Sequence, residues 1–351
     1  LLIDRQGTYQ NYPYYSIDGG KTWKNSTLSD ELSFMPYNNR MSIPMWSTVD
    51  ENKVWIHTQG DYASSSTDSG KTFKWDSNGI TGILSGGNVH YNVYNPDIIY
   101  FGSQDYDGCV TTDGGKTWKY ISMSGYRWGG FCYGGYAVDE NTYFVGVSDA
   151  WHNPRKLKIT FDGGKTIVDT GMYFTKENIN AGIESSYQSP TNPKVLFACD
   201  LRSEDGGHTW AKMDGCINVY THNPKGQKEL YGMDETGKYV VASYDDGKTW
   251  KKVNNTEFIP NPKYASAHVM DVAYDWKNEV AYATCEGGYL YKTSTKDGSV
   301  ECVLNRYVDE YKRAPVNLNG GYCISKVAVD PIDPNIISVS YTHLTLPTIR
   351  L

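Results

Sequence analysis

Thr111-Thr112-Asp113-Gly114-Gly115-Lys116-Thr117-Trp118 is the clearest copy of an eight-residue motif that recurs along the chain. The shared pattern is Ser/Thr-x-Asp-x-Gly-x-Thr followed by a bulky apolar residue. Further copies occupy residues 16–23, 66–73, 160–167, 203–210 and 243–250, and a degraded copy occupies residues 295–299. The motif aspartates, which recur every 40 to 52 residues, are Asp18, Asp68, Asp113, Asp162, Asp205, Asp245 and, in the degraded copy, Asp297. A period of this length is typical of solenoids and propellers.

The motif has the composition of a tight hairpin turn between two strands. The carboxylate of Asp113 can accept hydrogen bonds from backbone amides of its own turn, and Gly115 can adopt a positive φ without a Cβ clash. Thr117 and Trp118 then begin the next strand, where the indole ring would cover the gap between neighbouring sheets. We therefore expect the motif aspartates to be structural rather than catalytic.

The motif resembles the Asp-box, or BNR, repeat, and the segments between the boxes read as three further strands. In the second unit, residues 43–49, 54–58 and 63–66 precede the box, and a fourth strand starts at Phe73. Turns such as Asn95-Pro96-Asp97 separate first strands from second strands, because Pro cannot donate to a sheet ladder. The sequence predicts an all-β fold, a seven-bladed β-propeller of four-stranded antiparallel blades with Asp-box turns.

The count of seven blades assumes that the two ends of the chain complete each other. The first box has few residues before it, and the last strand pair, residues 326–339, has no box after it. We expect one domain over residues 1–340, as a fragment of a longer protein. Residues 341–351 fit no blade and resemble the translated adaptor tails of assembled reading frames, so they are left out of the predicted fold.

Charge and composition exclude several classes of function. The net charge of −7 argues against a nucleic-acid partner, and no apolar run is long enough for a transmembrane helix. The seven cysteines fit no zinc-binding spacing, so we predict no metal and no cofactor. Buried free thiols and disulfides both stay open for Cys109, Cys132, Cys199, Cys216, Cys285, Cys302 and Cys323.

Acidic residues gather in the turns between second and third strands, on the face away from the boxes. They are Asp61, Asp105, Asp107, Asp149, Asp200, Asp234 and Glu286. Paired carboxylates flanking a scissile bond are the usual equipment of glycoside hydrolases, so Asp105, Asp107, Asp149 and Glu286 are the candidate catalytic residues. The alternative is that each acid caps its own turn.

Aromatic residues in long loops on the same face suit a sugar platform. Tyr126, Arg127 and Trp128 stand among glycines in the link after the third box, and Trp151 and His152 follow Asp149. Loops positioned by a rigid scaffold often carry function, so these five are the candidate substrate-binding residues. The alternative is that they cover the end of the core. His90, His268 and Glu184 begin first strands near this face and are expected to be structural.

The box, the Pro turn and the repeat together resemble the family 74 glycoside hydrolases and the sortilin-like receptors. Family 74 enzymes are two tandem propellers that cut β-glucan backbones with inversion, using one aspartate from each propeller. The nearest matches to their motif here are residues 104–108 and 285–288. The resemblance implies an extracellular or cell-surface monomer that acts on or binds a plant or host polysaccharide.

Two alternatives accompany the hydrolase interpretation. A sortilin-like propeller would bind a protein or peptide without catalysis. An exo-sialidase would bind the sialic acid carboxylate with three arginines, and Arg127, Arg306 and Arg313 fall in links on one face, after a distorted copy of the early sialidase motif at residues 40–44. Because a fold does not imply a function, enzyme and binding scaffold both stay open.

Overall fold

A computed structural model describes most of the chain as a succession of small sheets. The described residues are 2–5, 11–29, 41–58, 62–76, 85–103, 108–125, 131–148, 153–173, 185–225, 228–258, 269–285, 289–305, 324–341 and 349–350. All elements among them are β-strands, which confirms the predicted all-β class. No helix in this part of the chain is long and apolar enough to cross a membrane.

The strands fall into eight sheets. The first contains β1 (Leu2–Arg5), β2 (Asn11–Tyr15) and β3 (Lys24–Asn25). The second contains β4 (Thr27–Leu28), β5 (Met41–Trp46), β6 (Val54–Thr58), β7 (Tyr62–Ser66) and β8 (Thr72–Trp75). The third contains β9 (Ser85–Tyr91), β10 (Ile99–Ser103), β11 (Gly108–Thr111) and β12 (Lys119–Ile121).

The remaining sheets repeat the same order of strands. They contain β13 (Phe131–Ala137), β14 (Tyr143–Ser148), β15 (Lys156–Thr160) and β16 (Val168–Tyr173); β17 (Ser186–Gln188), β18 (Leu196–Ala198), β19 (Leu201–Ser203) and β20 (Ala211–Lys212); and β21 (Asn218–His222), β22 (Leu230–Met233), β23 (Val240–Ser243) and β24 (Lys251–Lys252). The last two contain β25 (Val269–Asp275), β26 (Val280–Cys285), β27 (Tyr289–Ser294) and β28 (Val300–Asn305); and β29 (Ile324–Val329), β30 (Ile336–Tyr341) and β31 (Ile349–Arg350).

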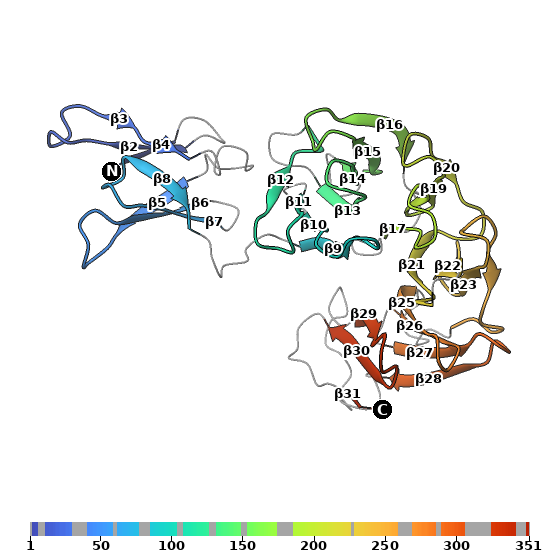
Figure 1. Ribbon diagram of the computed structural model, residues 1–351. Coiled ribbons are helices and arrows are strands. Elements are labelled where there is room, and N and C mark those ends of the chain that lie inside the picture. The colour runs from blue at the N-terminus through green and yellow to red at the C-terminus, as the bar shows by residue number, and fades with distance from the viewer. Residues whose placement is uncertain are drawn as a thin grey trace.

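Strand order within each sheet follows the chain, and neighbouring strands are antiparallel, as the repeat predicts. One pairing departs from it, because β4 runs parallel to β8. The sheets from β9 to β30 follow one another around an arc (Figure 1). The first strand of each sheet contacts the first strand of the next, in the series β9, β13, β17, β21, β25 and β29. First strands therefore lie innermost, which is the arrangement of propeller blades.

The hydrophobic cores lie between successive sheets. Tyr136, Phe144 and Leu196 belong to a core between the fourth and fifth sheets, and Tyr231, Val272 and Tyr291 belong to one between the sixth and seventh. Similar clusters join the third sheet to the fourth, the fifth to the sixth and the seventh to the eighth. The fourth to seventh sheets are therefore each stabilised by two neighbours in the series.

All six boxes form the turn that their sequence predicts. In the third box, Asp113 Oδ1 accepts hydrogen bonds from Thr111 Oγ1 at 2.7 Å and from the Thr117 amide at 2.9 Å. The other carboxylate oxygen accepts one from Thr117 Oγ1 at 2.6 Å. The same three bonds recur at Asp18, Asp68, Asp162, Asp205 and Asp245. Each carboxylate therefore holds its own turn together, and the purely structural role of these aspartates stays a prediction.

The last residue of the box covers the neighbouring sheet in some copies only. Trp210 packs against the core between the fourth and fifth sheets, with its ring 5.3 Å from that of Phe144. Trp250 packs in the same way on the next core. Trp23 and Trp118 are instead 43% and 40% exposed. The indole ring of the box therefore covers the gap between two sheets, as expected, where a sheet packs closely on the sheet before it.

The two ends of the chain do not combine into one blade among the described strands. The sheets of β1–β3 and β29–β31 are separate, and the outer edge of β30 is occupied by β31, which pairs Ile349 with Ile337. Three residues of the tail therefore lie in a sheet from which the sequence pattern excluded them, namely Tyr341 in β30 and Ile349 and Arg350 in β31. The total of seven blades stays a prediction.

Candidate functional site

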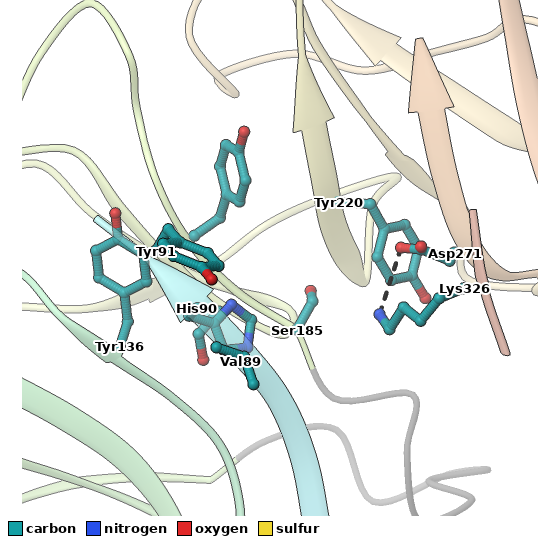
Figure 2. A pocket seen from close by; sticks show the side chains of 10 residues that line it. Val89, His90, Tyr91, Tyr136, Ser185, Tyr220, Asp271 and Lys326 are labelled. Carbon is teal, nitrogen blue, oxygen red and sulfur yellow. Dashed lines mark hydrogen bonds and ion pairs between the residues drawn. The ribbon is translucent and has the colours of Figure 1, made fainter. Parts of the chain in front are cut away.

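The innermost strands border an open central cavity of about 450 Å³. One wall comes from β9, β13 and β17 and the other from β21, β25 and β29, so six sheets contribute to it. Figure 2 shows His90, Tyr91 and Tyr136 on the first wall and Tyr220, Asp271 and Lys326 on the second. The lining residues are Val89, His90, Tyr91, Tyr136, Ser185, Ser186, Tyr187, Tyr220, Asp271 and Lys326.

β-Bulges shape the second wall. Val219 and Thr221 pair with consecutive residues of β22, which leaves Tyr220 as the extra residue of a bulge. The registers of β25 and β29 shift in the same way just before Asp271 and Lys326. A bulge re-aims the side chains beside it, and here all three face the cavity (Figure 2).

Asp271 and Lys326 form a partly buried ion pair. Lys326 Nζ lies 3.4 Å from Asp271 Oδ1, while the other carboxylate oxygen accepts a hydrogen bond from the Val327 amide at 3.0 Å. The ammonium group lies 5.9 Å from the centre of the Tyr220 ring. Burial raises the pKa of Asp271, although the Lys326 charge and the Val327 amide oppose that rise.

Two buried polar atoms on the first wall have no hydrogen-bond partner among the described residues. They are His90 Nε2 and Ser186 Oγ. Burial and, to a smaller extent, the positive charge of Lys326 together lower the pKa of His90 to about 3, so the imidazole is neutral at physiological pH. A buried polar group without a partner is costly, and both residues line the cavity.

The tyrosine hydroxyls nearby are used by the protein itself. Tyr136 accepts a hydrogen bond from the Val93 amide at 2.9 Å and donates one to Gln188 Oε1 at 3.2 Å. Tyr187 forms a bond of 2.5 Å with His222 Nδ1. Because these polar tips are engaged, the rings are held in fixed orientations and offer mainly aromatic surface to the cavity.

The predicted catalytic and substrate-binding residues lie outside the described residues. This holds for Asp105, Asp107, Asp149, Glu286, Tyr126, Arg127, Trp128, Trp151 and His152. Two acids of the same kind of turn are described. Asp234 accepts hydrogen bonds from Thr236 Oγ1 and from the Lys238 and Tyr239 amides, so it caps its own turn. Asp200 pairs with Lys212 at 3.0 Å.

The sequence analysis did not select Tyr220, Asp271 or Lys326. A signal was present, because Lys326 interrupts the apolar run of β29 and Asp271 interrupts that of β25. A charged residue in a buried strand needs a partner or a function. Within the described ranges, no group of three His, Cys, Asp or Glu side chains could hold a metal ion. The six cysteines found there are free thiols, and Cys302 is the exposed one.

Comparison with known proteins supports the repeat and the fold. The BNR/Asp-box repeat family matches residues 14–25. The comparison with curated proteins returned no match. The xyloglucanase of glycoside hydrolase family 74 from Xanthomonas campestris is 16% identical with a TM-score of 0.50, over 74% of this chain and 42% of that one. The chain therefore spans less than half the length of that enzyme.

Two further similar structures are a second family 74 enzyme and the protein YCF48. The family 74 enzyme of Niastella koreensis is 13% identical with a TM-score of 0.43, over 83% of this chain and 49% of its own. YCF48 from Cyanidioschyzon merolae is 15% identical with a TM-score of 0.42, over 86% and 92%. Identities this low show at most a common fold. The chain is thus an Asp-box repeat β-propeller whose fold resembles that of the family 74 xyloglucanases.

Proposed function

We propose that the protein binds an oligosaccharide at the centre of the propeller. The observation that carries this proposal is the central cavity, where four tyrosine rings meet a carboxylate–ammonium pair and two unpartnered polar atoms. Binding sites for small molecules are concave, largely apolar, and contain a few polar groups that fix orientation. The cavity has all of these features.

Each part of the lining has a role that suits a sugar. The faces of Tyr91 and Tyr220 provide flat apolar surface for a pyranose ring, whose C–H groups are apolar. Asp271 can accept hydrogen bonds from sugar hydroxyls and Lys326 can donate to them, and hydrogen bonds to charged groups are stronger than neutral ones. Because the groups come from six sheets, the rigid scaffold fixes their positions before the ligand arrives.

We further propose that acids of the second-to-third-strand turns act on the bound sugar as a glycoside hydrolase. Inversion needs two carboxyl groups about 6.5–9.5 Å apart. Asp271 is the one carboxylate among the described lining residues, and it is held by Lys326 and Val327. Asp105 or Asp107 is therefore proposed as the acid or base, with Asp149 or Glu286 as partner and Trp128 as a binding residue.

A panel of plant and host polysaccharides tests both proposals. Isothermal titration measures binding, and release of reducing ends measures cleavage. We expect at least one oligosaccharide to bind and to be cleaved. The double variant Asp105→Asn, Asp107→Asn should lower turnover by several orders of magnitude, and Trp128→Ala should chiefly weaken binding. Binding without cleavage would remove the hydrolase proposal. Binding of peptides but no sugar would favour the sortilin-like alternative, and release of sialic acid would favour the sialidase.

We also propose that the protein is a monomer at the cell surface or outside the cell. Polysaccharides are encountered there, and a propeller buries its strands within one chain. Light scattering on the purified protein tests the monomer, and fractionation of the source cells tests the location. A dimer, or a protein confined to the cytosol, would contradict these two statements.

A further inference from the structure

The polar groups of the central cavity are arranged on two opposing walls. On one wall, Lys326 Nζ makes a single hydrogen bond among the described residues, to Asp271, and its side chain is 35% exposed. An ammonium group has three donors. Two of them are therefore free to bind a ligand beside the Asp271 carboxylate.

The other wall contributes the two unpartnered atoms. Ser186 is 1% exposed, so its hydroxyl has no access to bulk solvent and no partner among the described residues. His90 Nε2 is in the same situation, and the His90 ring lies edge-on to Tyr136 with centroids 6.2 Å apart. Because both residues line the cavity, a ligand that reaches both walls can bond to the hydroxyl and the imidazole nitrogen once these side chains turn towards it.

The charges of the described lining sum to zero. Lys326 contributes +1 and Asp271 contributes −1, and no other lining residue is charged while His90 is neutral. The carboxylate of an acidic sugar could pair with Lys326, but it would also lie close to Asp271, and like charges at short distance repel each other. A pair of neighbouring hydroxyls has no such conflict, because one can donate to the carboxylate and the other can accept from the ammonium.

The position of the cavity restricts which part of a polymer can enter. Innermost strands of six successive sheets border it. The middle of a long polymer needs both an entry to the cavity and an exit from it, whereas a chain end needs only one opening. We propose that the cavity binds the terminal residue of a neutral oligosaccharide, with Asp271 and Lys326 clamping two adjacent hydroxyls and Ser186 and His90 contacting the residue from the opposite wall. This proposal rests on the proposed function.

Two sets of ligands test the recognition of a neutral chain end. The neutral oligosaccharide that binds best in the panel is compared with the same oligosaccharide oxidised to the carboxylate at its primary hydroxyls. We expect the oxidised form to bind at least tenfold more weakly. In a series of increasing chain length, affinity per mass of sugar should fall, because ends become rarer. Equal or tighter binding of the oxidised form, or affinity per mass that holds or rises with length, would overturn the proposal.

Substitutions of Lys326 and Asp271 then test whether these two residues contact the ligand. Lys326→Met and Asp271→Asn each remove a charged hydrogen-bonding group, and we expect Kd for the neutral oligosaccharide to rise by about tenfold or more. Asp271→Asn also leaves a net positive cavity, so it should improve binding of the oxidised form relative to the neutral one. Lys296→Met and Glu279→Gln, which break an exposed ion pair elsewhere in the fold, are the matched controls and should leave Kd unchanged.

The outcomes separate this proposal from the one on which it rests. Circular dichroism and thermal melting establish that each variant is folded. If sugar binds and the Lys326 and Asp271 variants bind it as the wild type does, the clamp is wrong while the carbohydrate-binding function stands. If no oligosaccharide binds the wild type, the proposed function fails and this proposal fails with it.

Discussion

The two glycines of the fifth box provide a sharp test of why the box has its sequence. Gly206 and Gly207 both have positive φ, of 78° and 97°. A Cβ atom added to Gly206 would have no neighbour within 4 Å. A Cβ atom added to Gly207 would overlap the Cδ1 atom of Ile159, which belongs to the preceding sheet. A change to alanine is therefore opposed by the positive φ alone at Gly206, and by both the positive φ and the overlap with Ile159 at Gly207.

The magnitudes follow from these two obstacles. A left-handed conformation costs an L-residue about 1–2 kcal/mol, and the reduced freedom of the unfolded chain returns about 0.4–1 kcal/mol on changing Gly to Ala. Gly206→Ala should therefore destabilise by about 1 kcal/mol. Ile159 is 1% exposed and cannot move aside freely. Overpacking of a core costs about 1–3 kcal/mol, so Gly207→Ala should destabilise by about 2–4 kcal/mol.

Urea unfolding, followed by tryptophan fluorescence, measures the difference between the two variants. Both should unfold with the slope of the wild type, since a changed slope would signal altered cooperativity rather than stability. We expect Gly207→Ala to be the less stable by about 1–3 kcal/mol. Equal stabilities would show that the box does not pack against the preceding sheet, and a less stable Gly206→Ala would reverse the assigned roles.

Three further predictions concern the boxes and the thiols. Hydrogen bonds from Thr166 lower the pKa of Asp162 to about 2. The stabilising contribution of the ionised Asp162 is therefore present above the unfolded pKa of about 3.9 and lost as pH falls towards 2. The Tm of the wild type should fall over that range of pH, and the Tm of Asp162→Asn should fall less steeply. The same dependence of Tm on pH in both proteins would contradict this. Asp113→Ala should lower Tm but leave sugar affinity intact, and lost affinity in a folded variant would show that the box takes part in binding. Among the six described cysteines, native-state labelling read by mass spectrometry should modify Cys302 alone, and early labelling of buried Cys216 would refute that burial.

The part of the fold that the sequence predicted well is the part decided by local chemistry. Box turns depend on an Asp, a Gly and a Thr within a few residues, and each forms as expected. The strand predicted over residues 54–58 is β6, with the same bounds. The predicted turn Asn95-Pro96-Asp97, before β10, closes through a hydrogen bond from the Ile98 amide to the Asn95 carbonyl.

Features that depend on distant segments were not predictable in the same way. Nothing in residues 27–28 indicates that they add a parallel strand to β8. The pairing of β31 with β30 was likewise not predicted, because residues 341–351 fit no blade and were left out of the predicted fold. Both pairings provide hydrogen-bond partners for the backbone groups of an edge strand, and an edge strand can pair with any extended segment that reaches it. Local pattern therefore predicts the turns of this fold better than its edges.

The central cavity shows why a site can escape a search that proceeds turn by turn. Candidate residues were sought in turns, because turns on one face of a propeller are easily aligned from the repeat. The cavity instead takes one to three residues from each of six strands, far apart in the chain. Bulges determine which of them point inward, and a bulge at Tyr220 is visible only when β21 is paired with β22. What the sequence does show is the cost of two charges, Asp271 and Lys326, among the apolar residues of β25 and β29. A search for charged residues in the first strands, followed by pairing them across the ring, would have brought these two residues together.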